Sequence, residues 1–170
     1  MNKSVSIIIP TYNRRIQLRQ NLDAIDRQRF EGYLEVIVVD DESVDGTSQI
    51  LKRVALRNNN FVFKYFRSDH IGSAEARNLA ISNSKGDILI FLDDDSMIQN
   101  ENYVNEVIKS FQEDNVGIVA GKTIDILTGI YRLIRIGDPP EINFDNELHP
   151  HKFSKSESMS IYIVAQKSVQ

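Results

Sequence analysis

Short apolar runs alternate with amphipathic stretches along the first 120 residues of the chain. Continuous apolar runs rich in β-branched residues are typical of strands buried on both faces, and they occupy residues 5–10, 34–41, 61–66, 87–95 and 116–121. Apolar residues at helical spacing, several after capping or turn residues, predict helices over residues 14–28, 43–56, 72–84 and 102–114. Strands that are apolar throughout and alternate with helices predict an α/β fold, a three-layer α/β/α sandwich around a mostly parallel sheet.

The hydrophobic pattern weakens after residue 122. Residues 122–137 are expected to form a hairpin or an extended arm, with Gly129 near the turn. Residues 138–158 are polar, contain three of the four prolines and predict a long loop. Residues 159–169 are expected to return as a strand into the core, and a length of 170 residues predicts a single domain.

Composition excludes several classes of protein but does not identify a function. Twenty basic against 24 acidic residues give a net charge of −4, which predicts no general attraction to nucleic acid or to an anionic membrane. The chain has no cysteine, which excludes disulfides and thiolate chemistry. Its apolar runs are far shorter than the roughly 20 residues of a spanning helix, and its start lacks a signal-peptide pattern. A cytoplasmic location is expected, and association with the inner face of a membrane stays open.

Three consecutive carboxylates, Asp93, Asp94 and Asp95, end the apolar run at residues 87–92. If the strand continued through them, Asp93 and Asp95 would share one face about 6.6 Å apart. They would repel by about 0.6 kcal/mol in water and by about 2.5 kcal/mol at an effective dielectric of 20. A divalent cation would compensate this charge, and so would water or a helix N-terminus. Ser96 and Asn100 are capping residue types, so a polar lead-in to a helix is the structural alternative.

Polar residues also follow the other predicted strands, at residues 10–14, 40–43 and 68–72. Ligands of open α/β sheets bind outside the carboxyl ends of the strands, so these segments and residues 93–96 are candidates for a site. Ser43 and Asp45 are interpreted as turn and capping residues.

Four segments, "VSIIIPTYNR", "VIVVDDESVDGT", "GSAEARNLAI" and "GDILIFLDDD", together resemble the nucleotide-sugar half of family 2 glycosyltransferases. The resemblance covers residues 4–96 and implies a single GT-A domain over residues 1–170. Residues 1–96 would be its nucleotide-binding half, and residues 97–170 part of its sugar and acceptor half. It further implies a metal-dependent, inverting enzyme of polysaccharide biosynthesis. Such an enzyme transfers a sugar from a nucleotide-sugar, a UDP-sugar being favoured, to a glycan or lipid-linked acceptor.

The resemblance implies a nucleobase pocket at the first two strand ends. Pro10, Thr11 and Tyr12 would line this pocket, with Tyr12 stacking on a uracil-like ring. Asp41 would accept a hydrogen bond from the imide N–H of the base, whereas Asp40 is expected to be structural.

The remaining implied residues concern the diphosphate, the sugar and the metal. Asp95 would contact a Mn²⁺ or Mg²⁺ that bridges the phosphates, since hard cations take oxygen ligands. Asp93 or Asp94 would contact ribose or sugar hydroxyls. Arg77 would reach the pocket or pyrophosphate, with an ion pair to an acid such as Asp94 as its structural alternative. Arg14 is either a diphosphate contact or a solvated arginine.

Two further expectations come from the same resemblance. Gly72 would permit close backbone approach at the start of its helix. The carboxylate base of such enzymes lies in an acidic motif downstream of a strand resembling residues 159–169, so the catalytic base is expected beyond Gln170.

Other acids and histidines of the second half are weaker candidates. The carboxylates at positions 138, 141, 145, 147 and 157 do not align with the acidic motif, and the histidines at positions 149 and 151 are interpreted as exposed. The alternatives are a non-catalytic nucleotide-sugar-binding module or an inactive N-terminal fragment. A nucleotidyltransferase is less favoured, because "PTYNRR" lacks the glycine of a phosphate loop.

Overall fold

A computed structural model describes residues 4–57, 59–96, 98, 100–111, 118–120, 123–124, 131–132 and 163–166 of the chain. The helices are α1 (Arg15–Asp26), α2 (Thr47–Leu56), α3 (Gly72–Ser82) and α4 (Tyr103–Ser110). The strands are β1 (Val5–Thr11), β2 (Leu34–Asp41), β3 (Val62–Ser68), β4 (Ile88–Phe91), β5 (Ile118–Ala120), β6 (Thr123–Ile124), β7 (Tyr131–Arg132) and β8 (Ile163–Gln166). Gly129 and the weak candidates of residues 138–158 lie outside the described residues.

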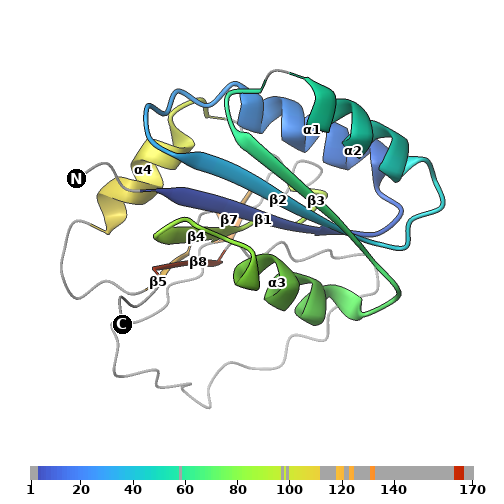
Figure 1. Cartoon of the computed structure of the whole chain (residues 1–170). Coiled ribbons are helices and arrows are strands. Elements are labelled where there is room, and N and C mark those ends of the chain that lie inside the picture. The colour runs from blue at the N-terminus through green and yellow to red at the C-terminus, as the bar shows by residue number, and fades with distance from the viewer. Residues whose placement is uncertain are drawn as a thin grey trace, which may run out of the picture.

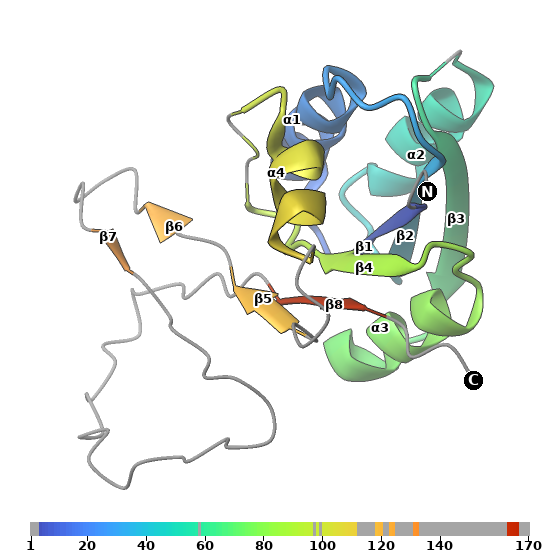
Figure 2. The same cartoon turned by 90° about the vertical axis from the view of Figure 1, so that its left-hand side faces the viewer.

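The main sheet has six strands in the order β3-β2-β1-β4-β8-β5 (Figures 1 and 2). Neighbours among β3, β2, β1 and β4 are parallel, and β8 is antiparallel to both β4 and β5. The predicted mostly parallel sheet is therefore confirmed, as is the return of residues 159–169 into it. β6 and β7 pair antiparallel, which confirms the hairpin alternative for residues 122–137.

Two hydrophobic cores cover the two faces of the sheet. Side chains alternate between the faces of a strand, so Ile7 and Ile9 of β1 enter one core and Ile8 enters the other. The first core packs against α1, α2 and α4, and the second against α3 through Ala76 and Ala80. Figure 1 shows the resulting three layers, with α1 and α2 on one side of the sheet and α3 on the other. The predicted α/β/α sandwich is confirmed.

Strand β4 is shorter than predicted, and this changes the geometry of the acidic segment. It ends at Phe91 instead of continuing to residue 95. The Ser96 backbone N–H donates to the Asp93 carbonyl at 3.0 Å, which closes a turn over the three aspartates. The expectation that Asp93 and Asp95 share one face of a strand was wrong, because a turn sends successive side chains in different directions.

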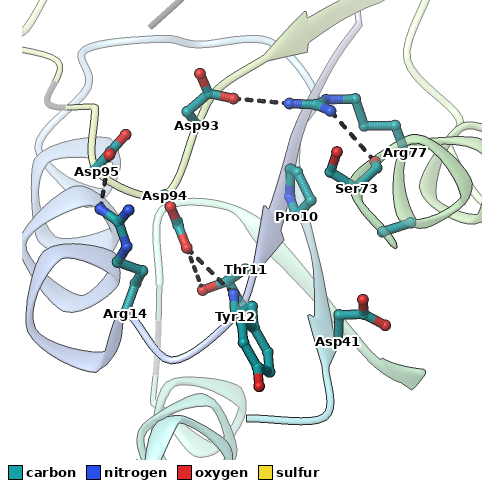
Figure 3. A pocket seen from close by; sticks show the side chains of 11 residues that line it. Pro10, Thr11, Tyr12, Arg14, Asp41, Ser73, Arg77, Asp93, Asp94 and Asp95 are labelled. Atoms are coloured by element: carbon teal, nitrogen blue, oxygen red, sulfur yellow. Dashed lines mark hydrogen bonds and ion pairs between the residues drawn. The ribbon is translucent and has the colours of Figure 1, made fainter. Parts of the chain in front are cut away.

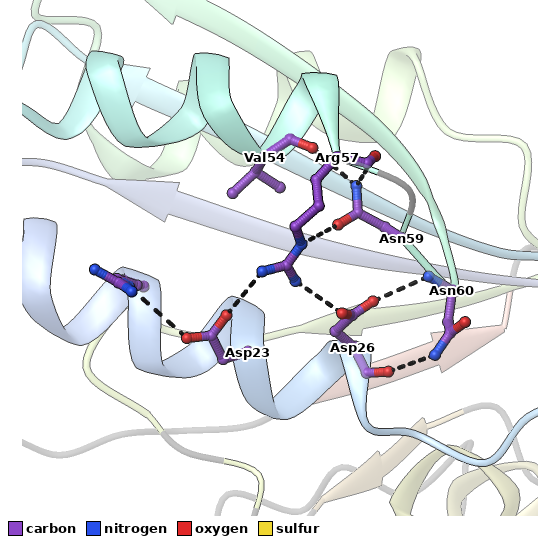
Figure 4. Close-up of polar contacts among 7 residues, drawn as sticks. Asp23, Asp26, Val54, Arg57, Asn59 and Asn60 are labelled. Carbon is purple, nitrogen blue, oxygen red and sulfur yellow. Dashed lines mark hydrogen bonds and ion pairs between the residues drawn. The ribbon is translucent and has the colours of Figure 1, made fainter.

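A polar cluster fastens the end of α2 and the following loop to the end of α1 (Figure 4). Arg57 forms ion pairs with Asp23 at 3.4 Å and with Asp26 at 2.7 Å. The Asn60 backbone N–H donates to the other Asp26 carboxylate oxygen at 2.9 Å. These contacts fix the helical layer at the end opposite to the carboxyl ends of the strands.

A second polar cluster surrounds Glu35 near the amino ends of the strands. The Glu35 side chain is fully buried and forms an ion pair with Lys64 at 2.7 Å. It also accepts hydrogen bonds from the Ser6 and Tyr33 hydroxyls and from the Lys85 backbone N–H. Burial alone would raise the pKa of Glu35, but these donors lower it from 4.5 to about 2. The cluster joins β1, β2, β3 and the segment before β4.

None of the helices that the structure describes is long and apolar enough to cross a membrane.

Candidate functional site at the carboxyl edge of the sheet

A pocket of about 420 Å³ opens at the carboxyl ends of β1, β2 and β4. It contains all nine residues that the sequence singled out, namely Pro10, Thr11, Tyr12, Arg14, Asp41, Arg77, Asp93, Asp94 and Asp95. Ser73 and Ala76 of α3 also line it and were missed. The available signal was helical spacing, since Ser73 lies four residues before Arg77 and three before Ala76, and residues three or four apart share a helix face.

The pocket lies where the strand order reverses. From β1 the chain proceeds to β2 and β3 on one side, and β4 then pairs with the other side of β1. Loops diverge at such a switch point and leave a crevice in which α/β proteins bind their ligands. The fold therefore provides a binding crevice at this edge.

The three aspartates of the turn each meet a different partner (Figure 3). Asp93 pairs with Arg77 at 2.8 Å, and Asp95 pairs with Arg14 at 2.8 Å. Asp94 accepts hydrogen bonds from the Thr11 hydroxyl at 2.8 Å and from the Tyr12 backbone N–H at 3.4 Å. The acid paired with Arg77 is thus Asp93, not Asp94 as suggested, because the turn directs Asp94 toward β1.

Burial is not fully compensated for two of these acids. Burial raises the pKa of Asp93, and the negative charge of Asp95 raises it further. The Arg77 guanidinium lowers this pKa but does not cancel the increase. Burial likewise raises the pKa of Asp94, despite the Thr11 hydroxyl and the Arg14 charge. Perturbed carboxylates in a pocket are typical of functional sites.

A buried side chain of α1 holds the backbone of the turn in place. Asn21 of α1 is buried, and its Nδ2 donates to the Asp93 carbonyl at 3.1 Å. Asn21 Oδ1 and Ser96 Oγ are buried and have no hydrogen-bond partner among the described residues. Ser96 therefore does not cap a helix through its hydroxyl, whereas Asn100 accepts from the Asn102 backbone N–H at 2.8 Å before α4.

Asp41 joins the end of β2 to the start of α3. One carboxylate oxygen accepts from the Ser68 hydroxyl at 2.8 Å and from the Ile71 backbone N–H at 2.9 Å, and the other from the Gly72 N–H at 2.9 Å. Burial alone would raise the pKa of Asp41, but these donors together lower it. Because two oxygens offer about four acceptor positions, one position remains for a ligand donor.

Gly72 is explained by its backbone conformation. Its φ is +80°, a region that residues with a side chain rarely adopt, and a Cβ built there would meet no described atom within 4 Å. The left-handed backbone, and not crowding within the protein, accounts for glycine here.

The acids and serine expected to be structural have structural partners. Asp40 is fully buried and accepts from the Ser43 backbone N–H at 2.9 Å. The Ser43 hydroxyl accepts from the Asn13 N–H at 2.8 Å. Asp45 accepts from the Thr47 and Arg15 backbone N–H groups at 3.0 and 2.9 Å, where α2 and α1 begin. The structural role of Asp40 and the capping role of Asp45 are confirmed, whereas the Ser43 hydroxyl contacts the loop after β1 and caps none of the described helices.

Three residues close to the pocket have a strained backbone conformation. Asn13, Glu42 and His70 have positive φ values of 52°, 66° and 47°, and they follow β1, β2 and β3. The rings of Tyr12 and His70 form an edge-to-face pair with centroids 5.5 Å apart. Strained residues of this kind are common at functional sites, where the surrounding structure holds them.

The acidic turn, which comprises residues 93–96, suits a metal that takes most of its ligands from a substrate. Within the described part of the chain, no three acidic or histidine side chains converge on one point as a complete metal cage would require. Hard cations such as Mg²⁺ usually combine one or two carboxylates with phosphate oxygens and water. The partly exposed carboxylate of Asp95 fits this pattern.

Comparison with known proteins identifies the family of the chain. The family model described as "Glycosyl transferase family 2" matches residues 6–165. The chain belongs to this family. Glycosyltransferase GlyA of Streptococcus pneumoniae is 29% identical over 71% of the chain, and glycosyltransferase AglE of Haloferax volcanii is 32% identical over 74%. The chain spans only 17% and 38% of the lengths of these two relatives.

Solved structures of glycosyltransferases have the same GT-A fold. Mannosyltransferase PcManGT from Pyrobaculum calidifontis, in complex with GDP-Man and Mn²⁺, matches with a TM-score of 0.65 and 28% identity. The match covers 69% of this chain and 35% of that one. S. aureus TarS 1-349 in complex with UDP-GlcNAc matches with a TM-score of 0.58 and 28% identity, over 68% and 33% of the two chains.

Proposed function

We propose that this glycosyltransferase domain binds a nucleotide-sugar, with UDP-sugars favoured, and transfers the sugar with inversion to a glycan or lipid-linked acceptor. The observation that carries the proposal is that one pocket brings together the nine residues that the family resemblance implies for such a ligand. The ends of β1, β2 and β4, the start of α1 and the helix α3 supply them, as a ligand with a base, a diphosphate and a sugar would require. Solved relatives that bind GDP-Man or UDP-GlcNAc support the donor class.

In the proposed complex, the nucleobase lies between the ends of β1 and β2. Tyr12 is 50% exposed, so its ring is available to stack on a base, and Pro10 and Thr11 form the adjoining wall. The remaining acceptor position of Asp41 takes the imide N–H of the base. A uracil fits this role, because its imide donates one hydrogen bond to a carboxylate.

The diphosphate and sugar lie beside the acidic turn. Arg14 and Arg77 supply cationic donors for phosphate oxygens. Asp93 and Asp94, whose charges the protein's own donors leave partly uncompensated, accept hydrogen bonds from ribose or sugar hydroxyls. Asp95 would hold a Mn²⁺ or Mg²⁺, and such an ion neutralises charge on the departing nucleoside diphosphate.

Calorimetry on the 170-residue chain tests the binding part of this proposal. UDP is expected to bind more tightly with Mn²⁺ than without it, and Asp95→Ala is expected to remove the difference. Asp23→Ala is the matched control, because Asp23 is an acid of α1 outside the pocket. Unchanged UDP binding in Asp95→Ala would contradict the metal assignment, and stronger binding of GDP than of UDP would contradict the donor assignment.

Activity is tested separately by incubating the chain with a panel of UDP-sugars and Mn²⁺. Release of UDP that increases when an acceptor glycan is added supports transfer. Tight binding without release under any condition contradicts the transfer step while leaving the donor site intact.

A further inference from the structure

The two arginines of the pocket hold the acidic turn from opposite sides (Figure 3). Arg77 belongs to α3, and its guanidinium contacts both Asp93 and the Ser73 carbonyl. Arg14 directly precedes α1, and the only hydrogen bond or ion pair of its side chain within the described structure is the one to Asp95 at 2.8 Å. The Arg14 side chain is 45% exposed and that of Asp95 is 23% exposed. Arg14 is therefore the less constrained of the two arginines.

The Arg14–Asp95 pair occupies the carboxylate that the proposed function gives to a divalent cation. A guanidinium and a divalent cation repel each other, so both do not share this carboxylate at close range. Binding of the cation thus requires Arg14 to leave. A diphosphate offers the guanidinium new acceptors of matching geometry on the same side of the pocket.

We propose that Arg14 is an exchangeable counter-charge of Asp95, and that this exchange makes cation binding depend on a bound nucleoside diphosphate. The inference rests on the proposed function and adds to it a link between two ligands. Without a diphosphate, the cation competes with Arg14 for Asp95. With a diphosphate bound, Arg14 moves to phosphate oxygens and Asp95 becomes free. Since coupling between two ligands is reciprocal, the cation must strengthen diphosphate binding by the same factor.

The exposure of the pair limits the size of the effect. Ion pairs as exposed as Arg14–Asp95 usually change an equilibrium constant by about two- to fivefold. Arg14 therefore weakens cation binding without abolishing it. A charge-assisted hydrogen bond to a phosphate changes an equilibrium constant by about tenfold or more. The phosphate contact is thus strong enough to draw Arg14 away from Asp95, and the coupling is limited to the about two- to fivefold effect of the pair that is broken.

Titration of the 170-residue chain with Mn²⁺, with the free ion followed by electron paramagnetic resonance, tests the exchange. The titration is carried out with and without saturating UDP on the wild type, Arg14→Gln and Arg15→Gln. Arg15 is the matched control, because it is the adjacent arginine, lies outside the pocket and has no ion-pair partner among the described residues.

Arg14→Gln is expected to bind Mn²⁺ about two- to fivefold more tightly than the wild type when UDP is absent. The ratio of Mn²⁺ affinities with and without UDP is expected to fall by the same factor, about two- to fivefold. Arg15→Gln should match the wild type in both measurements. A lower UDP-free affinity in Arg14→Gln, or an affinity ratio equal to that of the wild type, overturns the exchange. If wild-type protein binds no Mn²⁺ even with UDP, the proposed function itself is overturned.

Discussion

Glu35 at the amino end of the sheet and the acidic turn at the carboxyl end bury carboxylates in opposite ways. At the amino end, Glu35 is fully buried, yet its surroundings lower its pKa to about 2, because an ammonium, two hydroxyls and a backbone N–H all donate to it. At the carboxyl end, burial raises the pKa values of Asp93 and Asp94, since their partners compensate less than burial costs. The protein itself supplies enough donors to keep the buried Glu35 carboxylate charged. The acidic turn has too few donors to offset the burial of Asp93 and Asp94, and we propose that a ligand supplies the rest. We therefore assign a structural role to Glu35 and a binding role to the acidic turn.

Glu35→Gln should show the largest effect on stability. It removes the charge that Lys64 faces inside the protein, where Lys64 is only 24% exposed. Removing one partner of a buried ion pair costs about 3–5 kcal/mol of unfolding free energy. Urea denaturation of the purified chain measures this loss. Tyr33→Phe is the control, because it removes a single donor and should cost about 1 kcal/mol.

The Glu35 contribution should also disappear in acid. Its pKa is near 4.5 when unfolded and about 2 when folded, so the stabilisation is complete above pH 4.5 and is lost as pH falls toward 2. The difference in unfolding free energy between wild type and Glu35→Gln should therefore shrink by roughly 3 kcal/mol across this window. Comparing the two proteins cancels the titration of the other carboxylates. A difference that stays constant with pH would contradict the assigned pKa.

Gly86→Ala tests the packing of the same end. A Cβ at Gly86 would overlap the Ser6 backbone nitrogen and would lie 2.5 Å from the Ser6 hydroxyl, which the Glu35 cluster uses. Overpacking of this kind costs about 1–3 kcal/mol, measured as a lower midpoint of denaturation. Gly72→Ala provides a comparison without crowding, where only the positive φ is unfavourable. Equal stability of Gly86→Ala and wild type would show that the two segments are not packed this closely.

Asp94→Asn should have the smallest effect on stability. The amide oxygen still accepts from the Thr11 hydroxyl, and the substitution removes a charge whose burial is unfavourable. We expect the unfolding free energy to stay within about 0.5 kcal/mol of the wild type or to rise. A loss above about 1 kcal/mol would mean that the acidic turn is a structural feature like Glu35.

The sequence predicted one end of the sheet better than the other. Most of the predicted pocket residues follow apolar strands, and because parallel strands end at the same edge, their positions together with the family resemblance were enough to predict one site. Glu35 was not singled out, because it occupies one position of the apolar strand at residues 34–41. Its partners Ser6, Lys64 and Lys85 are 29, 29 and 50 residues away, and they are brought beside it by the pairing of β1 and β3 with β2 and by the segment before β4.

The hydrophobic pattern also could not predict the local backbone geometry of the acidic turn. The run of apolar residues at 87–92 continued the strand period into the aspartates, but the hydrogen bond from Ser96 to the Asp93 carbonyl ends the strand and forms a turn. This turn decides which arginine meets which acid. The order of β8 within the sheet likewise depends on pairing between segments more than 70 residues apart, for which the sequence offers no local signal.

The central claim is that the acidic turn serves ligand binding rather than folding. Equilibrium unfolding of wild type and Asp95→Asn, each alone and with UDP plus Mn²⁺, tests it most directly. At ligand concentrations about 100 times the wild-type dissociation constant, the wild type should gain about 2.7 kcal/mol. Asp95→Asn should match the wild type within about 0.5 kcal/mol without ligands and should gain no more from UDP plus Mn²⁺ than from UDP alone. Equal gains in both proteins, or a marked loss of ligand-free stability in the variant, would contradict the claim.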